Sequence, residues 1–396
     1  MYNFSEIIDR KGSGSIKIEA LNQFFGREDL IPLWVADMDF RTPDFITDAL
    51  KDRVGHPIFG YSAIPDDYFT TIAAWVHELH DWDVDPQWIR YIPGIVKGIA
   101  MVLECFFDKD AKVIIQSPVY HPFRNVPTGL GHTVVTNPLR PVYGNNGELL
   151  TYHMDLEDLD AKLSEDSSIK VLILSNPHNP CGIAWDRSEL EGLAVVAQKH
   201  NLLVISDEIH SEMVLGGRKH IPFASVSDEA ARHSITFQAP SKTFNIAGIV
   251  SSYTIIPDDG LRGRFFQWLD AGEFDAPCLF STIATMAAYK HGRQWRSEML
   301  DYLQGNVDFV DSFISQHIPG IHCVRPQASF LVWLDCRALG LDHDALVDLF
   351  VNKAHLALND GAMFGTEGSG FMRLNVGCPR SILEKAMQQL DKAINN

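Results

Sequence analysis

Three polar residues of different types each follow a short apolar run in the middle of the chain. Asn179 stands in a loop with two prolines, Asp207 closes the run at 202–207, and Lys242 follows the run at 234–238. If these runs are parallel strands, their carboxyl ends bring the three side chains to one edge of a sheet, where ligands of such sheets bind. An amide, a carboxylate and an amine would then share one site.

Each of these signals alone has an ordinary structural explanation. A lysine after a strand is usually a surface residue, an Asp-Glu pair can cap a helix, and Asn-Pro followed by Gly is usually a turn. Asp207, Glu208 and His210 could also be metal ligands, or a base with the residue that orients it. The order Asn179, Asp207, Lys242, each after its own strand, favours one joint site.

A binding site for pyridoxal 5'-phosphate (PLP) needs these parts. A lysine amine bonds to the aldehyde, and a carboxylate holds the ring nitrogen protonated so that the ring can accept electrons. A lysine that is desolvated behind an apolar strand has the lowered pKa that suits such an amine. Asn179, Asp207 and Lys242 therefore indicate a PLP site.

The elements that must position these residues alternate between strands and helices. Apolar, β-branched runs predict strands at 111–117, 133–137, 170–175, 202–207, 234–238 and 249–256. Amphipathic helices are predicted between several of them, at 98–107 and 188–200. Nearly continuous apolar strands that alternate with helices predict an α/β fold with a mostly parallel sheet sandwiched by helices.

The pattern changes after about residue 285. Helices are predicted at 297–316, 342–354 and 381–394, with a strand at 329–335. We therefore expect a large PLP-binding domain over 46–285 and a smaller α+β domain over 286–396. The N-terminal segment 1–45 is expected to join the smaller domain.

Composition excludes several classes of protein. The 396 residues carry a formal net charge of -18, which disfavours nucleic acid as a partner. The six cysteines are scattered without a CxxC pair, and the histidines lack an HxxxH or HExxH spacing, so neither a disulfide framework nor a metal site is predicted. No signal peptide and no membrane-spanning run are visible. A cytoplasmic location without a membrane partner is expected.

Several motifs give the chain a resemblance to a known family. They are Trp34-Val35-Ala36-Asp37-Met38-Asp39-Phe40, Ser117-Pro118-Val119-Tyr120, 176–182, Ser206-Asp207-Glu208-Ile209-His210, 240–245 and Arg373-Leu374-Asn375. With them, the chain resembles the fold-type I PLP enzymes of the class I/II aminotransferase superfamily over essentially its full length. Within that superfamily it is most similar to the MalY/PatB group of cystathionine β-lyases, which are cysteine-S-conjugate C–S lyases.

The resemblance implies roles for individual residues. Lys242 would bond to the cofactor aldehyde and then move the Cα proton, and Asp207 would pair with the ring nitrogen. The other implied cofactor contacts are Asn179 and His210 at the ring hydroxyl, Tyr120 on the ring face, and Ile95, Val96 and Ser241 at the phosphate. Tyr61 would reach the phosphate and substrate across a homodimer interface. Arg373 would bind the substrate carboxylate beside Ala36, because its planar fork suits a carboxylate.

Three positions depart from the aminotransferase pattern. His210 stands where many aminotransferases carry a Tyr, Ala239 where many relatives carry Ser or Thr, and Val250 where many carry a phosphate-binding Arg. Two of the usual phosphate contacts are therefore absent.

The implied reaction is α,β-elimination of L-cystathionine and related cysteine S-conjugates, small amino-acid substrates, to a thiol, pyruvate and ammonia. The residues themselves fit an amino-acid aminotransferase equally well, because both reactions begin with loss of the Cα proton. WVADMDF and SDEIH favour the lyase. A third alternative, a regulatory binding protein on the same fold, is disfavoured because the chain is acidic and keeps Lys242.

Overall fold

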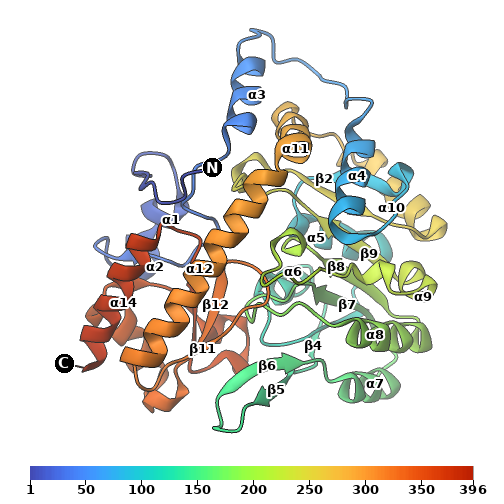
Figure 1. Cartoon of the computed structure of the whole chain (residues 1–396). Coiled ribbons are helices and arrows are strands. Elements are labelled where there is room, and N and C mark those ends of the chain that lie inside the picture. Colours follow the sequence, from blue (N-terminus) through green and yellow to red (C-terminus); the bar gives the residue numbers. More distant parts are fainter. Residues whose placement is uncertain (396) are drawn as a thin grey trace.

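Seven strands form the central sheet, in the order β2-β10-β9-β8-β7-β3-β4 (Figure 1). Figure 1 shows a computed structural model that describes residues 1–395, so residue 396 of the predicted C-terminal domain lies outside the described residues. The strands are β2 (Ile89–Ile92), β3 (Lys112–Ile115), β4 (Val134–Thr136), β7 (Ile169–Ser175), β8 (Leu203–Asp207), β9 (Ser234–Gln238) and β10 (Ser252–Ile255). β10 runs antiparallel to β2 and β9, and the other strand pairs of this sheet are parallel. The predicted mostly parallel α/β sheet is confirmed.

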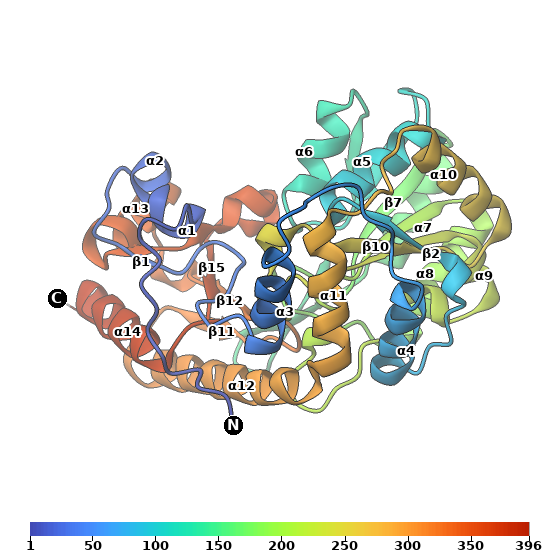
Figure 2. The same ribbon diagram turned by 90° about the horizontal axis from the view of Figure 1, so that it is seen from above.

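Helices cover both faces of this sheet because its strands are apolar on both faces. Val171 and Ile173 of β7 share an apolar core with one set of helices, while Leu172 and Leu174 share a second core with another set. The first set is α5 (Ile95–Phe106), α6 (Pro122–Gly129) and α10 (Asp259–Ala271). The second is α7 (Leu156–Glu165), α8 (Arg187–His200) and α9 (Asp228–Arg232), and Figure 2 shows the two sets on opposite sides.

A third group of helices packs against the end of the sheet formed by β2 and β10. It comprises α3 (Asp44–Val54), α4 (Tyr68–His80) and α11 (Leu279–His291). Trp75 of α4 stacks on Tyr289 of α11, with their ring centroids 5.0 Å apart. The long helix α12 (Arg293–His317) continues from α11 and leads to the smaller sheet (Figure 1).

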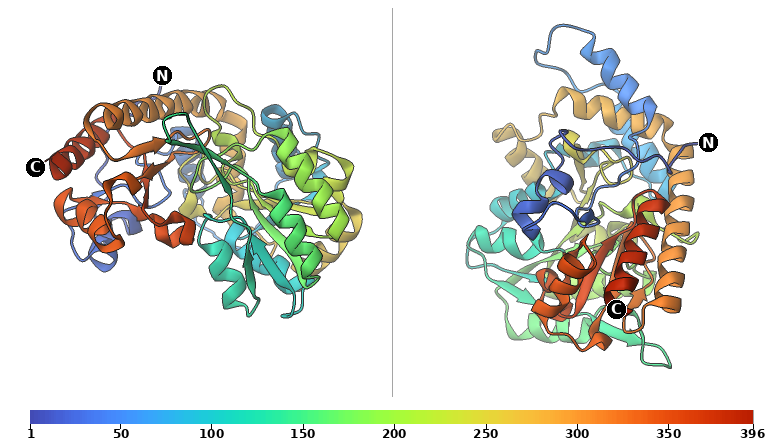
Figure 3. Two further views of the ribbon diagram at one scale, coloured as in Figure 1. Left: turned by 90° about the horizontal axis from the view of Figure 1, so that it is seen from below. Right: turned by 90° about the vertical axis from the view of Figure 1, so that its left-hand side faces the viewer.

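The smaller sheet has the order β11-β12-β15-β14, and its strand pairs are all antiparallel. Its elements are β11 (His322–Val324), β12 (Leu331–Asp335), β14 (Asn359–Asp360), β15 (Phe371–Asn375), α13 (His343–Asp348) and α14 (Arg380–Asn395). The N-terminal segment lies beside this part, since β1 (Ile31–Pro32) pairs with β13 (Leu356–Ala357) (Figure 3). The boundary expected between 285 and 286 falls inside α11, and the domain division stays a prediction.

Two predicted elements differ from the observed ones. The strand expected at 249–256 is reduced to β10, because Val250 adopts a left-handed conformation with φ of 55°. The helix expected at 342–354 ends as α13 at Asp348 and continues as a π-helical turn, Leu349–Lys353. Within the described residues, none of the helices combines the length and apolar character needed to cross a bilayer.

Candidate active site

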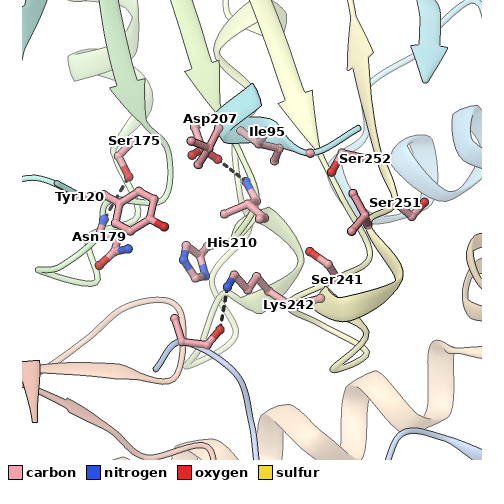
Figure 4. Close-up of a pocket in the computed structure, with 16 residues that line it drawn as sticks. Ile95, Tyr120, Ser175, Asn179, Asp207, His210, Ser241, Lys242, Ser251 and Ser252 are labelled. Atoms are coloured by element: carbon pink, nitrogen blue, oxygen red, sulfur yellow. Dashed lines mark hydrogen bonds between the residues drawn. The ribbon is translucent and has the colours of Figure 1, made fainter. Parts of the chain in front are cut away.

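Three adjacent parallel strands bring the predicted residues together. Asp207 is the last residue of β8, Asn179 lies four residues past the end of β7, and Lys242 lies four residues past the end of β9. Since β7, β8 and β9 are neighbours in the sheet, their carboxyl ends meet at one edge. Figure 4 shows the three side chains around one pocket of about 200 Å³.

The pocket contains most of the residues that the sequence indicated. Of the predicted site residues, all line it except Arg373 and Tyr61: Ala36, Ile95, Val96, Tyr120, Asn179, Asp207, His210, Ser241 and Lys242. Arg373 does not line the pocket itself, but it donates a hydrogen bond to the side chain of Asn179, which does. Tyr61 is fully exposed in the loop between α3 and α4, away from the pocket of its own chain.

The Lys242 amine lies in the pocket without a carboxylate bonded to it. Its Nζ donates to the main-chain carbonyl of Ala36 at 2.6 Å. Burial lowers the pKa of Lys242 to about 8, although the negative charge of Asp37 opposes this shift. An amine with this pKa is partly neutral near neutral pH, as a nucleophile or base must be.

Asp207 is a buried carboxyl group at the opposite end of the pocket. Burial raises its pKa to about 7, and the backbone N–H of Ile209, which donates to Oδ1 at 3.1 Å, lowers it only in part. A cation next to this carboxylate would hold it ionised, because an opposite charge favours the charged form. The protonated ring nitrogen of PLP is such a cation.

Hydrogen bonds hold the loop that carries Asn179 against the loop that carries Tyr120. The backbone N–H of Asn179 donates to Ser175 Oγ at 3.1 Å, and the N–H of Tyr120 donates to the Asn179 carbonyl at 3.0 Å. The two Asn-Pro bonds of the Asn179 loop, Asn176-Pro177 and Asn179-Pro180, are both cis. The Tyr120 ring faces the pocket in Figure 4, where a planar ring can stack on it.

Arg373 reaches this site from the smaller sheet. It is a buried residue of β15, and its guanidinium donates to Asn179 Oδ1 at 3.0 Å, Trp34 O at 3.1 Å and Asn359 Oδ1 at 2.5 Å. Burial lowers the pKa of Arg373 to about 10, so the group remains a cation at neutral pH. Its Nε has no hydrogen-bond partner within residues 1–395. A cation in this position can bind a carboxylate.

The wall of the pocket next to the N-terminus of α5 suits an anion. Gly94, at φ of +112°, precedes α5, and the first backbone N–H groups of a helix have no intrahelical acceptor. Ile95 and Val96 carry two of these groups and line the pocket. Hydroxyl-bearing side chains line the same wall: Ser241, Ser251 and Ser252. A helix N-terminus with hydroxyl donors fits a phosphate group.

Sequence reasoning missed Ser251 and Ser252. The run 249–256 is apolar enough to predict one continuous strand, which hid the two serines as ordinary strand positions. The left-handed turn at Val250 brings this segment to the wall of the pocket. The sequence signal for these contacts was the pair of serines directly after Val250, the position where many aminotransferases carry a phosphate-binding Arg.

His210 is the remaining polar side chain in the pocket. Burial lowers its pKa to about 3, so the imidazole is neutral. Its Nδ1 is buried and has no hydrogen-bond partner in the described part of the chain. A bound molecule with a polar group could satisfy this atom, because buried polar atoms are normally paired.

These features together fit PLP. The pocket provides an amine for the aldehyde, a buried carboxylate for the ring nitrogen, an aromatic face, and an anion-binding wall at a helix N-terminus. The unpartnered His210 Nδ1 provides a further polar contact.

Comparisons with known proteins agree with this geometry. The family described as aminotransferase class I and II matches residues 28–390. Cystathionine beta-lyase PatB of Bacillus subtilis (strain 168) is 39% identical over 393 residues, which are 99% of this chain and 100% of that protein. The structure of cystalysin from Treponema denticola, which contains PLP, superposes on this chain with a TM-score of 0.93 at 31% sequence identity. The superposition covers 100% of this chain and 99% of the cystalysin chain. A PLP-bound C–S lyase from Staphylococcus hominis has a TM-score of 0.90 at 30% identity, with 100% and 99% coverage.

Proposed function

The chain belongs to the class I and II aminotransferase family, and from this premise we propose that it is a PLP-dependent C–S lyase. Its reaction is α,β-elimination of L-cystathionine and related cysteine S-conjugates to a thiol, pyruvate and ammonia. The observation that carries the proposal is the convergence of Lys242, Asp207 and Asn179 from three adjacent strands, with Arg373 entering from the second sheet. The relatives named as cystathionine β-lyase and C–S lyase support the type of reaction.

PLP supplies an aldehyde that bonds to amines and a ring that accepts electrons from Cα. The protein supplies the rest of the chemistry. Lys242 would hold the cofactor by its aldehyde, and its amine, once free, would take the Cα proton of the substrate. Asp207 would pair with the ring nitrogen and keep it protonated, which would lower the barrier to removal of the Cα proton.

Arg373 fixes the substrate by its α-carboxylate. The guanidinium contacts the side chain of Asn179, which lines the same pocket as Lys242, so a carboxylate held by Arg373 would lie next to this pocket. This placement converts proton removal into a step between oriented groups. When the Cα–H electrons form the new C=C bond, the Cβ–S bond breaks and the thiolate leaves. The remaining three-carbon fragment reacts with water to give pyruvate and ammonia.

An amino-acid aminotransferase could use the same residues, because the reactions diverge only after Cα loses its proton. The products separate them. A lyase releases pyruvate without any keto acid, whereas an aminotransferase needs one and makes glutamate from 2-oxoglutarate and an amino donor. We expect no glutamate above the background of a cofactor-free control.

The protein is also proposed to act as a homodimer in which Tyr61 completes the partner's phosphate site. Support comes from the loop between α3 and α4, where Ile58, Phe59 and Tyr61 are exposed by 67%, 55% and 112%. Large apolar side chains gathered on a surface are typical of an interface. The cytoplasmic location stays a prediction.

Replacing Tyr61 with Phe should weaken PLP binding, because the phosphate loses one hydroxyl donor. We expect the Kd for PLP, measured by titration of the cofactor-free protein, to rise about tenfold. Tyr143→Phe is the matched control, since Tyr143 is exposed on β5 (Arg140–Tyr143) and does not line the pocket. A monomeric mass in sedimentation, or a Kd unchanged by Tyr61→Phe, would refute this part of the proposal.

A further inference from the structure

Five consecutive main-chain carbonyls next to the pocket, from Trp34 to Met38, each accept a hydrogen bond from a side chain. The donors are Arg373 to Trp34 O (3.1 Å), Asn375 to Val35 O (2.6 Å), Lys242 to Ala36 O (2.6 Å), Lys17 (3.2 Å) and Asn375 (2.7 Å) to Asp37 O, and Asn245 to Met38 O (2.8 Å). The segment 34–38 is neither helix nor strand. Side chains therefore hold its backbone where regular structure does not.

Three of these donors carry a charge, and Lys17 is the one of the three that has no role in the active site. It lies in the short helix α1 (Ile16–Glu19), and its side chain is fully buried. Its Nζ donates to Asp37 O and to Asp39 Oδ2, the latter at 2.8 Å. Burial of an ammonium group is costly unless its partners are well placed.

Charge pairing alone does not account for Lys17. Arg10 already pairs with both neighbouring carboxylates, at 2.7 Å to Asp37 and 2.7 Å to Asp39. No hydrogen bond is recorded from Arg10 to the backbone of 34–38, whereas Lys17 holds the carbonyl of Asp37. The contact that distinguishes Lys17 from Arg10 is thus its hydrogen bond to the main-chain carbonyl of Asp37. This carbonyl follows that of Ala36, which accepts the hydrogen bond from Lys242.

We propose that Lys17 is a positioning residue for Lys242. Together with Asn375, which donates to the same carbonyl at 2.7 Å, Lys17 fixes the backbone at Asp37 and so the place where the Ala36 carbonyl meets Lys242 Nζ. This inference rests on the role proposed for Lys242. A carbonyl in that place accepts a hydrogen bond from the ammonium form of Lys242, which is the form that exists after the amine has taken the substrate proton. Loss of the contact destabilises this ammonium and lowers the pKa of Lys242.

The test compares Lys17→Met with Arg10→Met. Both variants remove one positive charge beside Asp37 and Asp39, but only Lys17→Met removes a bond to the backbone of 34–38. The pKa of Lys242 is read in the cofactor-free protein by NMR titration of ¹³Cε-labelled lysine, and the signal is assigned by its absence in Lys242→Ala. The charge change alone moves the pKa upward in both variants, since a neighbouring cation is lost.

We expect the Lys242 pKa in Lys17→Met to fall about one unit below that in Arg10→Met. In the PLP-loaded enzyme, kcat of Lys17→Met should fall about tenfold with little change in KM, since the carboxylate contact through Arg373 remains. Equal Lys242 pKa values in the two variants would overturn the inference. If Lys17→Met does not fold, Lys17→Leu, which also lacks a donor, is compared with Arg10→Leu in the same way. Failure of the proposed function itself would show separately, as pyridoxal absorption that survives in Lys242→Ala.

Discussion

Lys242→Ala is expected to abolish the visible absorption that PLP shows when its aldehyde is bonded to a lysine. The reason is that Lys242 is the lysine whose amine lines the pocket, where burial lowers its pKa to about 8. Turnover should fall by about 10³-fold or more, because the variant loses both the amine that bonds to the aldehyde and the base that takes the Cα proton. Absorption spectra of purified protein at equal PLP content measure the first effect.

Lys97→Ala is the matched control for this experiment. Lys97 is an exposed residue of α5, one position after the pocket-lining Val96, and should leave the absorption unchanged. A Lys242→Ala protein that retained the visible band would show that another lysine bonds to the cofactor. That result would remove the basis of the site described above.

Asp207→Asn is expected to lower kcat by about 10²- to 10³-fold while PLP remains bound. An amide of the same shape keeps the packing but cannot hold the ring nitrogen protonated, so the ring accepts less charge from Cα. Tyr120, Lys242 and the wall formed by Ile95, Val96 and the serines would remain as the proposed contacts to the cofactor, so binding should survive. The PLP content of the denatured variant separates loss of turnover from loss of cofactor.

The pH dependence gives this prediction a second readout. Burial raises the pKa of Asp207 to about 7 in the cofactor-free protein, and a protonated ring nitrogen should lower it again. PLP should therefore stabilise the protein more at pH 8 than at pH 6, and this difference should vanish in Asp207→Asn. Wild-type turnover in Asp207→Asn would mean that another group protonates the ring.

The central sheet was predictable because its strands are unusually uniform. β7 and β8 are largely apolar and all three of β7, β8 and β9 are short runs rich in β-branched or aromatic residues, a pattern that favours buried parallel strands between helices. Once that topology is given, Asn179, Asp207 and Lys242 must lie at one edge. The site therefore follows from local patterns and one rule about parallel sheets.

Contacts between segments distant in sequence were not predictable in this way. The carbonyl of Ala36 meets Lys242 across 206 residues, and the family motif named Ala36 without showing that its backbone is the contact. Arg373 was expected from its motif, but its bond to Asn179 depends on how the smaller sheet packs against the larger one. Backbone conformation was also hidden, since a valine rarely adopts the positive φ of Val250.

Residue identity also leaves the reaction type open. Lyase and aminotransferase share the amine, the carboxylate and the arginine, and they differ in what happens after Cα loses its proton. The barrier to Cβ–S cleavage depends on the leaving group and on the orientation of its bond to the ring. Neither quantity is encoded in a local sequence pattern, so the products must decide.

The most direct test is therefore product release from L-cystathionine by the purified PLP-loaded protein with no keto acid present. The account predicts pyruvate and a new thiol in equal amounts, with neither formed by Lys242→Ala. No pyruvate from L-cystathionine, together with formation of glutamate once an amino donor and 2-oxoglutarate are supplied, would contradict the lyase assignment and identify an aminotransferase.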